Sequence, residues 1–503
     1  MPTEKLTEYE RRRLENIKRN HEIITSLKIQ STLSLLSSAT AAASKRNRVE
    51  RKSYKVSPQK KQKSEEPLVM RRSLRCRGMP PDSVGLGDDF SEPTAKAVYS
   101  SARYPDDGSV AGVVGPVSMR DTSRGSGSSE GLIKLISTRS SGLYAKGSGN
   151  EELSGDAGNE GNKIVWSSSL DCCETKYDGN RMKGSVDLES FGLEPENIAR
   201  VVPGRILSVR FFPTAEMMLV VAGNKYGDVG FWDVKSEDGD GIYLYHPHTE
   251  PVSGIVVSPF SLTKMYTSGY DGLLRLMDVE KEVFDLVYTG EDSIYSMSQP
   301  PNNTNSIYFG EGNGELKMWD VRVGKASATW ELHDRRINSV DFSSGNTDIM
   351  ATSSTDATAC IWDLRMMRTD KPKPLTTVHH KQSVQSAYFS PSGTCLATTS
   401  LDNNVGLATD VNFEEKDMIF HNNLTGRWIS TFKAIWGWDD SYIYIGNMKR
   451  GVDILSATEK RQIFTLESPE MSAIPCRFDA HPCKVGTLAS ATSGGQIYIW
   501  TQH

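Results

Sequence analysis

Positively charged side chains beyond residue 220 are the residues best suited to chemistry, because lysine and arginine bind phosphate groups. They fall in loops or near the starts of expected strands, where they could cluster on one rim of a folded domain. The candidates are Lys225, Arg275, Arg335, Arg336, Arg427, Lys433, Lys449 and Arg450, together with Trp428, whose ring could stack on a base. Phosphate contacts of this kind are salt-sensitive and mostly independent of base sequence, so they predict a nucleic-acid-binding surface. The alternative role for Trp428 is packing in the core.

Two copies of the tetrapeptide Trp-Asp-x-Arg suggest a second kind of surface. They are Trp319-Asp320-Val321-Arg322 and Trp362-Asp363-Leu364-Arg365. We expect the tryptophan and aspartate to belong to a strand and its turn. Arg322 and Arg365 then lie just past the strand end, where a planar guanidinium can engage acceptors on a partner protein. The alternative is a local hydrogen bond between each arginine and its own strand.

Catalytic and metal-binding motifs are missing from the sequence. It contains no Walker loop, no His-Glu-x-x-His and no metal-ligand spacing. The seven cysteines form no Cys-x-x-Cys pair, which is typical of reduced thiols in an intracellular protein. A structural role is expected for the histidines that precede inner strands, namely His246, His248, His333, His379, His380 and His481. We therefore expect no enzymatic activity, no cofactor and no bound metal.

A repeated phrase provides the scaffold for these residues. Small residues, a turn containing Asp, Asn or Gly, and an apolar strand that ends in or near Trp-Asp recur along the chain. The strand ends fall at positions 232, 277, 319, 362, about 408, about 454 and 500. Their spacing is the WD-repeat period, with one four-stranded blade per repeat. The sequence thus predicts an all-β, seven-bladed WD-repeat β-propeller over residues 197–503. The seventh repeat lacks an outer strand, which residues 197–202 are expected to supply, closing the ring.

The residues before the propeller differ from it in composition and in hydrophobic pattern. Residues 1–38 are predicted to form a short amphipathic helical segment, because Leu14, Ile17, Ile24 and Leu27 share one helical stripe. This helix is expected to dock on a partner; the alternative is that it packs on the propeller or stays loose. Residues 39–162, basic and then rich in Gly and Ser, are predicted to be a disordered linker. Residues 163–196 are predicted to be a partly ordered lead-in.

Charge is unevenly divided between arm and body. Residues 1–81 carry 20 Lys and Arg against 8 Asp and Glu, a net of +12; since the chain carries −5, the remainder carries −17. Two basic clusters predict a nuclear-localisation signal, with a solvated tail as the alternative. They consist of Lys45, Arg46, Arg48, Arg51 and Lys52, and of Lys60, Lys61 and Lys63. Ser57-Pro58 lies between them and resembles a proline-directed kinase site, where a phosphate would partly cancel the charge.

The chain also resembles a known family. The segments 9–20, 202–206, 223–227, 270–272 and 426–436 are similar to those of WD-repeat-containing protein 76 and its fungal relatives, the changed-mutation-rate DNA-damage-binding proteins. This resemblance implies a nuclear, chromatin-linked protein with affinity for damaged duplex DNA. The two Trp-Asp-x-Arg copies resemble the signature of cullin-4 ubiquitin-ligase substrate receptors, which dock on the adaptor DNA-damage-binding protein 1.

A more distant resemblance is to DNA-damage-binding protein 2. It implies DNA-facing roles for Lys225 and Arg336 and an adaptor-docking role for Arg365. The segment Gly426-Arg427-Trp428 matches the lesion-probing hairpin of that protein, but the residues of the hairpin tip differ. The departure puts lesion recognition in doubt.

The hypothesis that follows is a nuclear DNA- and chromatin-binding propeller that acts as a cullin-4 substrate receptor. The main alternative is an interaction scaffold that binds histone or other peptides in its central channel without touching DNA. One strongly positive face would favour DNA, whereas a neutral or acidic channel would favour basic peptides. A hydrolytic propeller would need an acid–base or metal cluster that the sequence does not contain. No signal peptide and no membrane span are expected.

Overall fold

The structure, a computed structural model, describes Lys18 and residues 114–125, 130–137, 182–236, 240–258, 261–301, 303–410, 412–426 and 429–502. Apart from Lys18, these residues belong to one compact unit, residues 101–503. The helix predicted within residues 1–38 and the two basic clusters therefore lie outside the described residues. No helix in the described part of the chain is long and apolar enough to cross a membrane.

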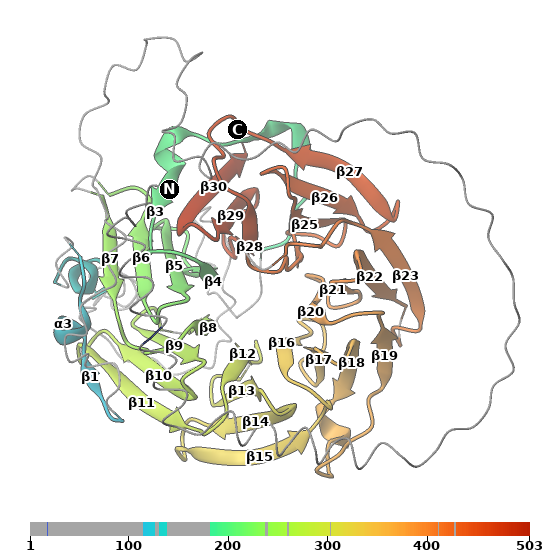
Figure 1. The fold of residues 1–503 in the computed structure, drawn as a ribbon, viewed down its shortest axis with the longest axis horizontal. Coiled ribbons are helices and arrows are strands. Elements are labelled where there is room, and N and C mark those ends of the chain that lie inside the picture. Colours follow the sequence, from blue (N-terminus) through green and yellow to red (C-terminus); the bar gives the residue numbers. More distant parts are fainter. Residues whose placement is uncertain are drawn as a thin grey trace, which may run out of the picture. The chain divides into compact units, whose positions relative to one another are not determined.

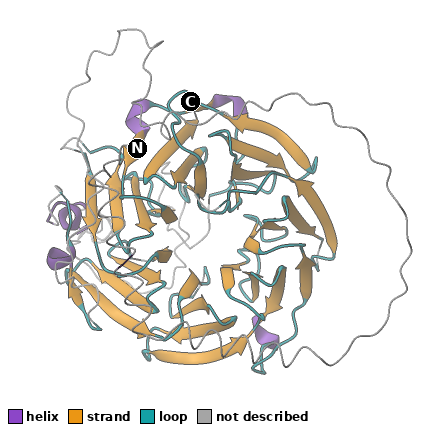
Figure 2. Ribbon diagram, viewed as in Figure 1, coloured by secondary structure: helices purple, strands orange, loops and turns teal. Residues whose placement is uncertain are grey.

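Seven antiparallel sheets form a closed ring around a central channel (Figure 1). Almost all of the ordered elements are strands, and the few helices are short (Figure 2). This is the seven-bladed β-propeller that the repeat period predicted. In each blade the strands follow one another outward from the channel, so consecutive strands are neighbours.

The blades are numbered in chain order. Blade 1 comprises β4 (Ile206–Phe211), β5 (Leu219–Asn224), β6 (Val229–Asp233) and β7 (Ile242–Tyr245). Blade 2 comprises β8 (Val252–Val257), β9 (Lys264–Gly269), β10 (Leu273–Asp278) and β11 (Val283–Thr289). Blade 3 comprises β12 (Ile294–Ser298), β13 (Ser306–Glu311), β14 (Glu315–Asp320) and β15 (Lys325–Glu331). Blade 4 comprises β16 (Ile337–Phe342), β17 (Ile349–Ser354), β18 (Thr358–Asp363) and β19 (Thr376–His379).

The remaining blades complete the ring. Blade 5 comprises β20 (Val384–Phe389), β21 (Leu396–Ser400), β22 (Asn404–Thr409) and β23 (Glu415–Phe420). Blade 6 comprises β24 (Ile435–Trp436), β25 (Tyr442–Gly446), β26 (Val452–Ser456) and β27 (Arg461–Leu466). Blade 7 comprises β28 (Pro475–Ala480), β29 (Thr487–Thr492) and β30 (Gln496–Gln502). Short 3-10 helices lie at Leu188–Ser190 (η3), Pro195–Asn197 (η4) and Leu364–Met366 (η5).

The chain closes the ring as predicted. Strand β3 (Ile198–Arg200) pairs antiparallel with β30, with Ile198 opposite Tyr498 and Arg200 opposite Gln496. A second strand, β2 (Phe191–Gly192), pairs with the far end of β30, so the ordered sheet begins before residue 197. The fourth strand of blade 7 thus comes from residues that precede blade 1.

The hydrophobic core is divided into seven clusters, one between each pair of neighbouring blades. Between blades 7 and 1, for example, Ile497 and Ile499 pack with Ile206, Val209 and Val220. The other clusters join the remaining neighbours in the same way. Because strands inside a blade are covered by blades on both sides, they read as near-continuous apolar runs. Burial of both sheet faces is what holds the blades at a fixed angle to one another.

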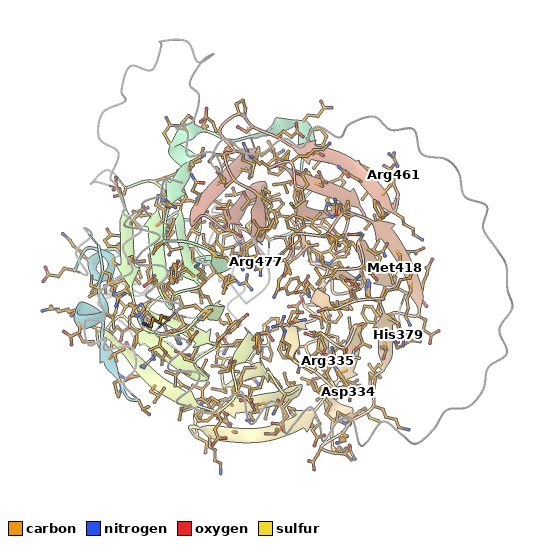
Figure 3. All side chains as sticks on the ribbon, in the orientation of Figure 1. Asp334, Arg335, His379, Met418, Arg461 and Arg477 are labelled. Atoms are coloured by element: carbon orange, nitrogen blue, oxygen red, sulfur yellow. The ribbon has the colours of Figure 1, made fainter. Side chains whose placement is uncertain are left out.

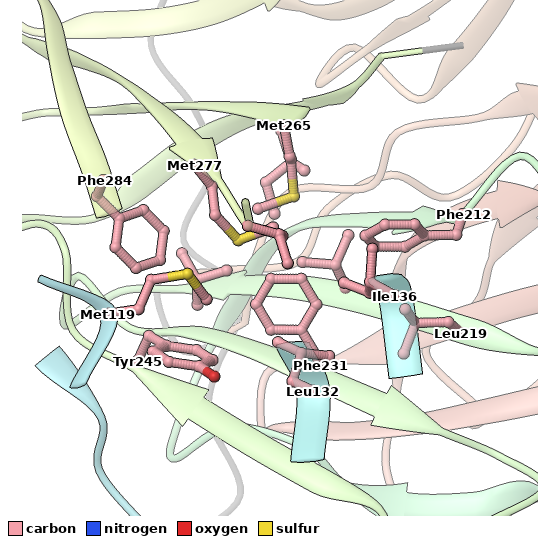
Figure 4. Packing of buried hydrophobic residues seen from close by; sticks show 14 of the residues in the cluster. Met119, Leu132, Ile136, Phe212, Leu219, Phe231, Tyr245, Met265, Met277 and Phe284 are labelled. Carbon is pink, nitrogen blue, oxygen red and sulfur yellow. The ribbon is translucent and has the colours of Figure 1, made fainter. Parts of the chain in front are cut away.

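Part of the predicted linker is ordered, which contradicts the prediction of disorder for residues 39–162. Strand β1 (Val117–Ser118) adds a fifth strand to blade 2 by pairing with β11, and α3 (Met119–Thr122) follows it. Residues 130–137 form a further short helix. Met119, Leu132 and Ile136 are fully buried in the cluster between blades 1 and 2 (Figure 4). Composition suggested disorder because these few apolar residues stand among Gly and Ser, but the propeller supplies the partner surface.

Candidate nucleic-acid interface

The propeller has two faces, defined here by the innermost strands. The entry face is where these strands begin, and the exit face is where they end. The turn between the second and third strands belongs to the entry face, because it contacts the residue that precedes the inner strand. In blade 1 the N–H of Lys225 donates to the carbonyl of Arg205 at 2.9 Å, and in blade 4 the N–H of Thr355 donates to the carbonyl of Arg336 at 3.2 Å. Residues after a third strand belong to the exit face.

Five of the predicted cations lie on the entry face. Lys225 is in the β5–β6 turn, Arg335 and Arg336 directly precede β16, and Lys449 and Arg450 form the β25–β26 turn. All except the half-buried Arg336 are exposed. The Lys225 ammonium lies 4.5 Å from the centre of the Tyr226 ring. These side chains come from blades 1, 4 and 6, so they surround the channel opening.

Tight turns hold the exposed lysines and arginines outward. The Oδ1 of Asn447 accepts hydrogen bonds from the N–H groups of Lys449 and Gly451, both at 2.9 Å. In blade 1, the Oδ1 of Asn224 likewise accepts from Tyr226 at 2.8 Å and from Asp228 at 2.9 Å. Asparagine is suited to this work because its side chain mimics a backbone turn. The backbone of both turns is thereby fixed while the cationic side chains stay in water.

A cavity of about 330 Å³, which we call the mouth cavity, opens at the centre of the entry face. Its lining comprises Arg205, Leu207, Tyr270, Tyr295, Arg336, Asn338, Gln385, Gly426, Ile429, Ser430, Thr431, Lys433 and Arg477. Among these described residues four are cationic and none is a carboxylate. Arg477 projects toward the axis of the ring (Figure 3). The cavity is therefore a partly open space lined by basic residues.

Backbone carbonyls and hydroxyls hold the cations of the mouth cavity. Arg477 donates through Nε to the carbonyl of Leu207 at 2.8 Å and through Nη1 to the carbonyl of Thr431. The Arg336 Nε donates to Thr355 Oγ1 at 3.0 Å. Lys433 Nζ donates to the carbonyl of Asn338 at 2.9 Å. No described carboxylate forms an ion pair with Lys433, Arg336 or Arg477, so their charges are not neutralised.

The pKa values of the basic residues in the mouth cavity are shifted by burial and by their mutual repulsion. Burial lowers the pKa of Lys433 well below its ordinary value, and the neighbouring charges of Arg477, Arg210 and Arg336 lower it further. Burial likewise lowers the pKa of the Arg477 guanidinium. Like charges confined in a poorly solvated space repel one another, which disfavours the protonated form. An anion in the mouth cavity would relieve this repulsion.

The channel toward its exit end carries charges of both signs. A second cavity of about 390 Å³ extends along the inner strands and is lined by Asp341 and Asp479 as well as by Arg210, Lys433 and Arg477, of which the last two also line the mouth cavity. Each carboxylate links neighbouring blades: Asp479 Oδ2 accepts from the Phe211 N–H and Asp341 Oδ2 from the Phe389 N–H, both at 2.8 Å. Arg210 approaches Asp479 to 3.8 Å. Carboxylates therefore accompany the basic residues toward the exit end, whereas the described lining of the mouth cavity contains none.

The prediction of a DNA-binding role for Arg275 is wrong. It lies within β10 and is fully buried. Its Nη1 donates to the carbonyl of Gly115 at 2.7 Å, which ties the residues before β1 to blade 2. A buried guanidinium committed to backbone carbonyls cannot reach a ligand on the surface, so its role is structural.

Two further predicted residues, Arg427 and Trp428, lie outside the described residues. The residues on either side of them, Gly426 and Ile429, line the mouth cavity. Their proposed DNA contacts stay predictions.

The sequence prediction missed part of the site. Arg205, Tyr270, Tyr295 and Arg477 also line the mouth cavity. The rings of Tyr270 and Tyr295 are 4.5 Å apart, and the Arg336 guanidinium lies 4.8 Å from the centre of the Tyr295 ring. One signal was available: Arg477 lies in a strand whose counterparts in blades 1 to 5 carry a small residue at the same place.

The arginines of the two Trp-Asp-x-Arg copies lie on the exit face of adjacent blades, 3 and 4. Both bind the aspartate of their own motif. Arg365 donates through Nε to Asp363 Oδ1 at 2.9 Å and through Nη2 to Asp363 Oδ2 at 2.7 Å. Arg322 Nη2 lies 3.4 Å from Asp320 Oδ2. The local hydrogen bond is thus present in both copies, yet the side chains of Arg322 and Arg365 are 69% and 63% exposed.

Three of the predicted histidines, His248, His333 and His380, occupy structural positions before an inner strand, whereas His379 is exposed in β19 and His481 follows the inner strand β28. His333 Nδ1 bonds Asp356 Oδ2 at 2.9 Å, and its Nε2 bonds Thr352 Oγ1 at 2.7 Å. Trp362 Nε1 donates to the same Thr352 hydroxyl at 2.8 Å. His248 with Asp271 and His380 with Asp402 repeat the pattern in blades 2 and 5. Within the described residues no group of three or more His, Cys, Asp or Glu side chains could hold a metal ion.

Comparison with known proteins places these observations in context. The family model of the WD domain, G-beta repeat, matches residues 324–363 and 372–407. The chain is 26% identical to WD repeat-containing protein 76 of Xenopus laevis, over 98% of this chain and 80% of that protein. It is 28% identical to DNA damage-binding protein cmr1 of Neurospora crassa, over 98% of both chains. WD repeat-containing protein 76 of Rhinolophus ferrumequinum is 28% identical over 98% of this chain and 74% of that protein.

Proposed function

We propose that this chain, a WD-repeat propeller similar over nearly its whole length to proteins named WD repeat-containing protein 76 and DNA damage-binding protein cmr1, binds DNA in the nucleus as a DNA-damage-related protein. It does so without catalysing a reaction. The observation that carries the proposal is the set of basic residues in the mouth cavity, whose described lining contains no carboxylate, surrounded by exposed cations on the same face.

The rim residues supply the duplex contacts in this proposal. Lys225, Arg335, Lys449 and Arg450 present mobile cations that can each approach one phosphate, while the tyrosines and Arg336 lie nearer the axis. Contacts of this kind fix a protein on the duplex without reading its sequence. Names of the fungal relatives contain the words DNA damage-binding, which supports the same ligand.

The charge of the channel opening also bears on the alternative scaffold function. A histone tail is basic, and its lysines would meet Arg205, Arg336, Lys433 and Arg477 at the entry-face opening with no described carboxylate to pair with. Placing like charges together in a poorly solvated space is unfavourable. DNA is therefore the better ligand for this face. In this proposal the protein lies near histones on chromatin but does not bind their tails in the channel.

The test is duplex-DNA binding by the full chain across a series of salt concentrations. The Lys225→Glu/Lys449→Glu variant removes two exposed cations from the entry face. The matched control, Lys325→Glu/Arg368→Glu, makes the same change of charge at exposed residues that follow the third strands of blades 3 and 4 on the exit face. Each lost phosphate contact lowers the slope of log affinity against log salt by about 0.9. We expect the slope to fall by about 2 in the first variant and to change little in the control.

Equal losses in the two variants would mean that only net charge matters and that the entry face is not the DNA site. Unchanged affinity in both variants would exclude the rim altogether. Damaged and undamaged duplexes are compared in the same assay, since preference for damage is part of the proposal.

A second function, docking on the cullin-4 adaptor DNA-damage-binding protein 1, is favoured by the exit face of blades 3 and 4. There the exposed arginines Arg322 and Arg365 are each followed by an exposed apolar side chain, Val323 and Met366. A guanidinium beside apolar surface is a common composition at the centre of protein interfaces. Because this surface lies on the face opposite the DNA site, both partners can bind together.

Adaptor docking is tested by binding of the purified adaptor to the full chain. The variant is Arg322→Ala/Arg365→Ala, and the matched control is Lys325→Ala/Arg368→Ala. A loss of at least about tenfold in affinity, corresponding to about 1.4 kcal/mol, is expected for the variant alone. If the affinity for the adaptor is unchanged when both arginines are replaced, their role is limited to the local hydrogen bonds described above.

Nuclear import is assigned in this proposal to the basic clusters of the arm. Replacing Lys60, Lys61 and Lys63 by Ala, with and without replacement of Arg51 and Lys52, should move a fluorescent fusion from the nucleus to the cytoplasm. A fusion that stays nuclear after all five changes would refute the assignment. Ser57→Asp tests whether negative charge between the clusters weakens import.

A further inference from the structure

We propose that the mouth cavity is a binding site for a phosphate group carried as a monoester or as a diphosphate. The proposal goes beyond duplex binding by the rim, because the cavity is lined by donors other than the rim residues Lys225, Arg335, Lys449 and Arg450. The residues that carry it are Arg336, Lys433 and Arg477.

Register shows that Arg477 occupies an unusual position. It pairs with Ala491 at the bulge of its inner strand. The residues at the same bulged pairing in blades 1 to 5 are small: Ser208, Gly254, Ser296, Ser339 and Ser386. A guanidinium at this place extends into the channel, where blades 1 to 5 contribute little volume. Blade 7 therefore delivers a planar cation to the axis of the ring.

Backbone bonds hold Arg477 in position and leave donors for a ligand. Its Nε and Nη1 are bound to the carbonyls of Leu207, Thr431 and Cys476. Its Nη2 makes no hydrogen bond with the described residues. Such an arrangement fixes the guanidinium plane in advance, so little side-chain entropy is lost when an anion binds.

Arg336 and Lys433 complete the set of donors. Arg336 is clamped between the Thr355 hydroxyl, 3.0 Å from its Nε, and the ring of Tyr295. Lys433 has one hydrogen bond, to the carbonyl of Asn338, and its ammonium can donate two more. Three cations that approach one space from three blades can bind the several oxygens of a phosphate group.

Size and charge favour a phosphate over other anions. The cavity volume of about 330 Å³ equals the liquid volume of roughly ten waters, which is enough for a diphosphate with part of its hydration shell but far too small for a duplex. A peptide carboxylate would bring one negative charge to a space lined by four basic side chains. A phosphomonoester or diphosphate brings about two or more, and its tetrahedral oxygens can reach donors on several walls.

Calorimetry with the full chain tests the proposal, using inorganic pyrophosphate as the probe. The variants Arg336→Gln and Lys433→Met remove one cation each from the mouth cavity, and Lys325→Gln is the matched control on the exit face. We expect each cavity variant to bind pyrophosphate at least about tenfold more weakly than the control, since hydrogen bonds to charged groups are among the strong ones.

Proton uptake provides a second measurement that a merely structural role would not change. Because burial and the charges of Arg477, Arg210 and Arg336 lower the pKa of Lys433, an anion that neutralises those charges should raise it again. Binding then takes up a proton, and the observed heat depends on the ionisation enthalpy of the buffer. This dependence should disappear in Lys433→Met. Thermal unfolding of the two variants near that of the control shows that each is folded.

Two kinds of oligonucleotide distinguish the source of the phosphate. Tighter binding of a short 5′-phosphorylated oligothymidylate than of pyrophosphate or the 5′-hydroxyl form would assign the site to DNA ends. Equal or tighter binding of pyrophosphate would assign it to a free phosphate compound. The rim variant Lys225→Glu/Lys449→Glu should retain pyrophosphate binding even where it loses duplex DNA, which separates this site from the proposed function. No pyrophosphate binding at about 10 mM, or equal affinity in the cavity variants and the control, would overturn the proposal.

Discussion

Replacing Asp356 by Asn should weaken blade 4 by an amount that depends on pH. Burial opposes ionisation of this carboxyl, but hydrogen bonds from His333 and Thr358 outweigh it and lower the pKa from 3.8 to about 2. The Asp356 side chain is only 16% exposed, so solvent screening of these bonds is modest. The same bonds position the residues after His333, namely Arg335 and Arg336.

The magnitude follows from the linkage between protonation and unfolding. The difference between 3.8 and about 2 corresponds to about 2.4 kcal/mol of free energy of unfolding at neutral pH. Because the folded-state pKa is the lower one, the contribution is complete above about pH 5. It is lost as the pH falls and has decreased to about 1.3 kcal/mol at pH 3 by the same relation.

Urea unfolding followed by tryptophan fluorescence measures this difference at several pH values. Asp348→Asn is the matched control, since Asp348 is in the same blade but its side chain is 48% exposed and bonds only the exposed Arg365. We expect the gap between wild type and Asp356→Asn to halve between about pH 5 and about pH 3, and the control to differ little at either pH. If the difference in free energy of unfolding between wild type and Asp356→Asn stays constant with pH, the Asn retains the hydrogen bond to His333 and the charge of the carboxylate contributes nothing.

Three further substitutions test the packing of the ring. Gly495→Ala should cost more than the roughly 1–2 kcal/mol of a left-handed alanine, because a Cβ there would lie 1.8 Å from the Val202 carbonyl oxygen; Gly324→Ala, with open space around it, is the control in thermal unfolding. Asp479→Ala should lower the free energy of unfolding by about 1–3 kcal/mol, since it leaves the Phe211 N–H without its acceptor between blades 7 and 1; an unchanged midpoint in urea would refute this role. Leu132→Ala should release residues 114–137 at a cost of about 2–5 kcal/mol and speed their limited proteolysis, whereas the exposed Lys134→Ala should not.

The propeller could be predicted from the sequence because each blade repeats the same short-range pattern. Third strands end at Asp233, Asp278, Asp320 and Asp363, close to the repeated Trp-Asp positions. Even the degenerate fifth and sixth repeats fold as β22 and β26, since neighbouring blades supply both of their buried faces. Closure by residues 198–200 followed from the missing outer strand of the last repeat.

Long-range packing accounts for what the sequence did not predict. The sequence around Arg275 suggests a strand with one outward cation, but residues near Gly115 cover it and accept its hydrogen bond. Nothing local to Arg275 indicates that a segment some 160 residues earlier lies against it. Arg477 was missed because the alternation of apolar and polar residues predicts only that it lies in a strand. The pattern does not show that its side of the strand lines the channel. Rim residues such as Lys225 and Lys449 were easier, because turns are recognisable and turns reach solvent.

The way in which the ring closes also constrains how the protein is made. Strand β3 pairs with β30 across 300 residues, from Ile198 to Tyr498. During synthesis, residues 191–200 therefore emerge early and must wait for almost the whole propeller before their partner strand exists. Until then the first blade and the growing end both present unpaired strand edges, which can pair with other chains. Slow closure of this kind makes the nascent chain dependent on factors that shield exposed edges, and premature termination before Gln496 would leave a ring that cannot close.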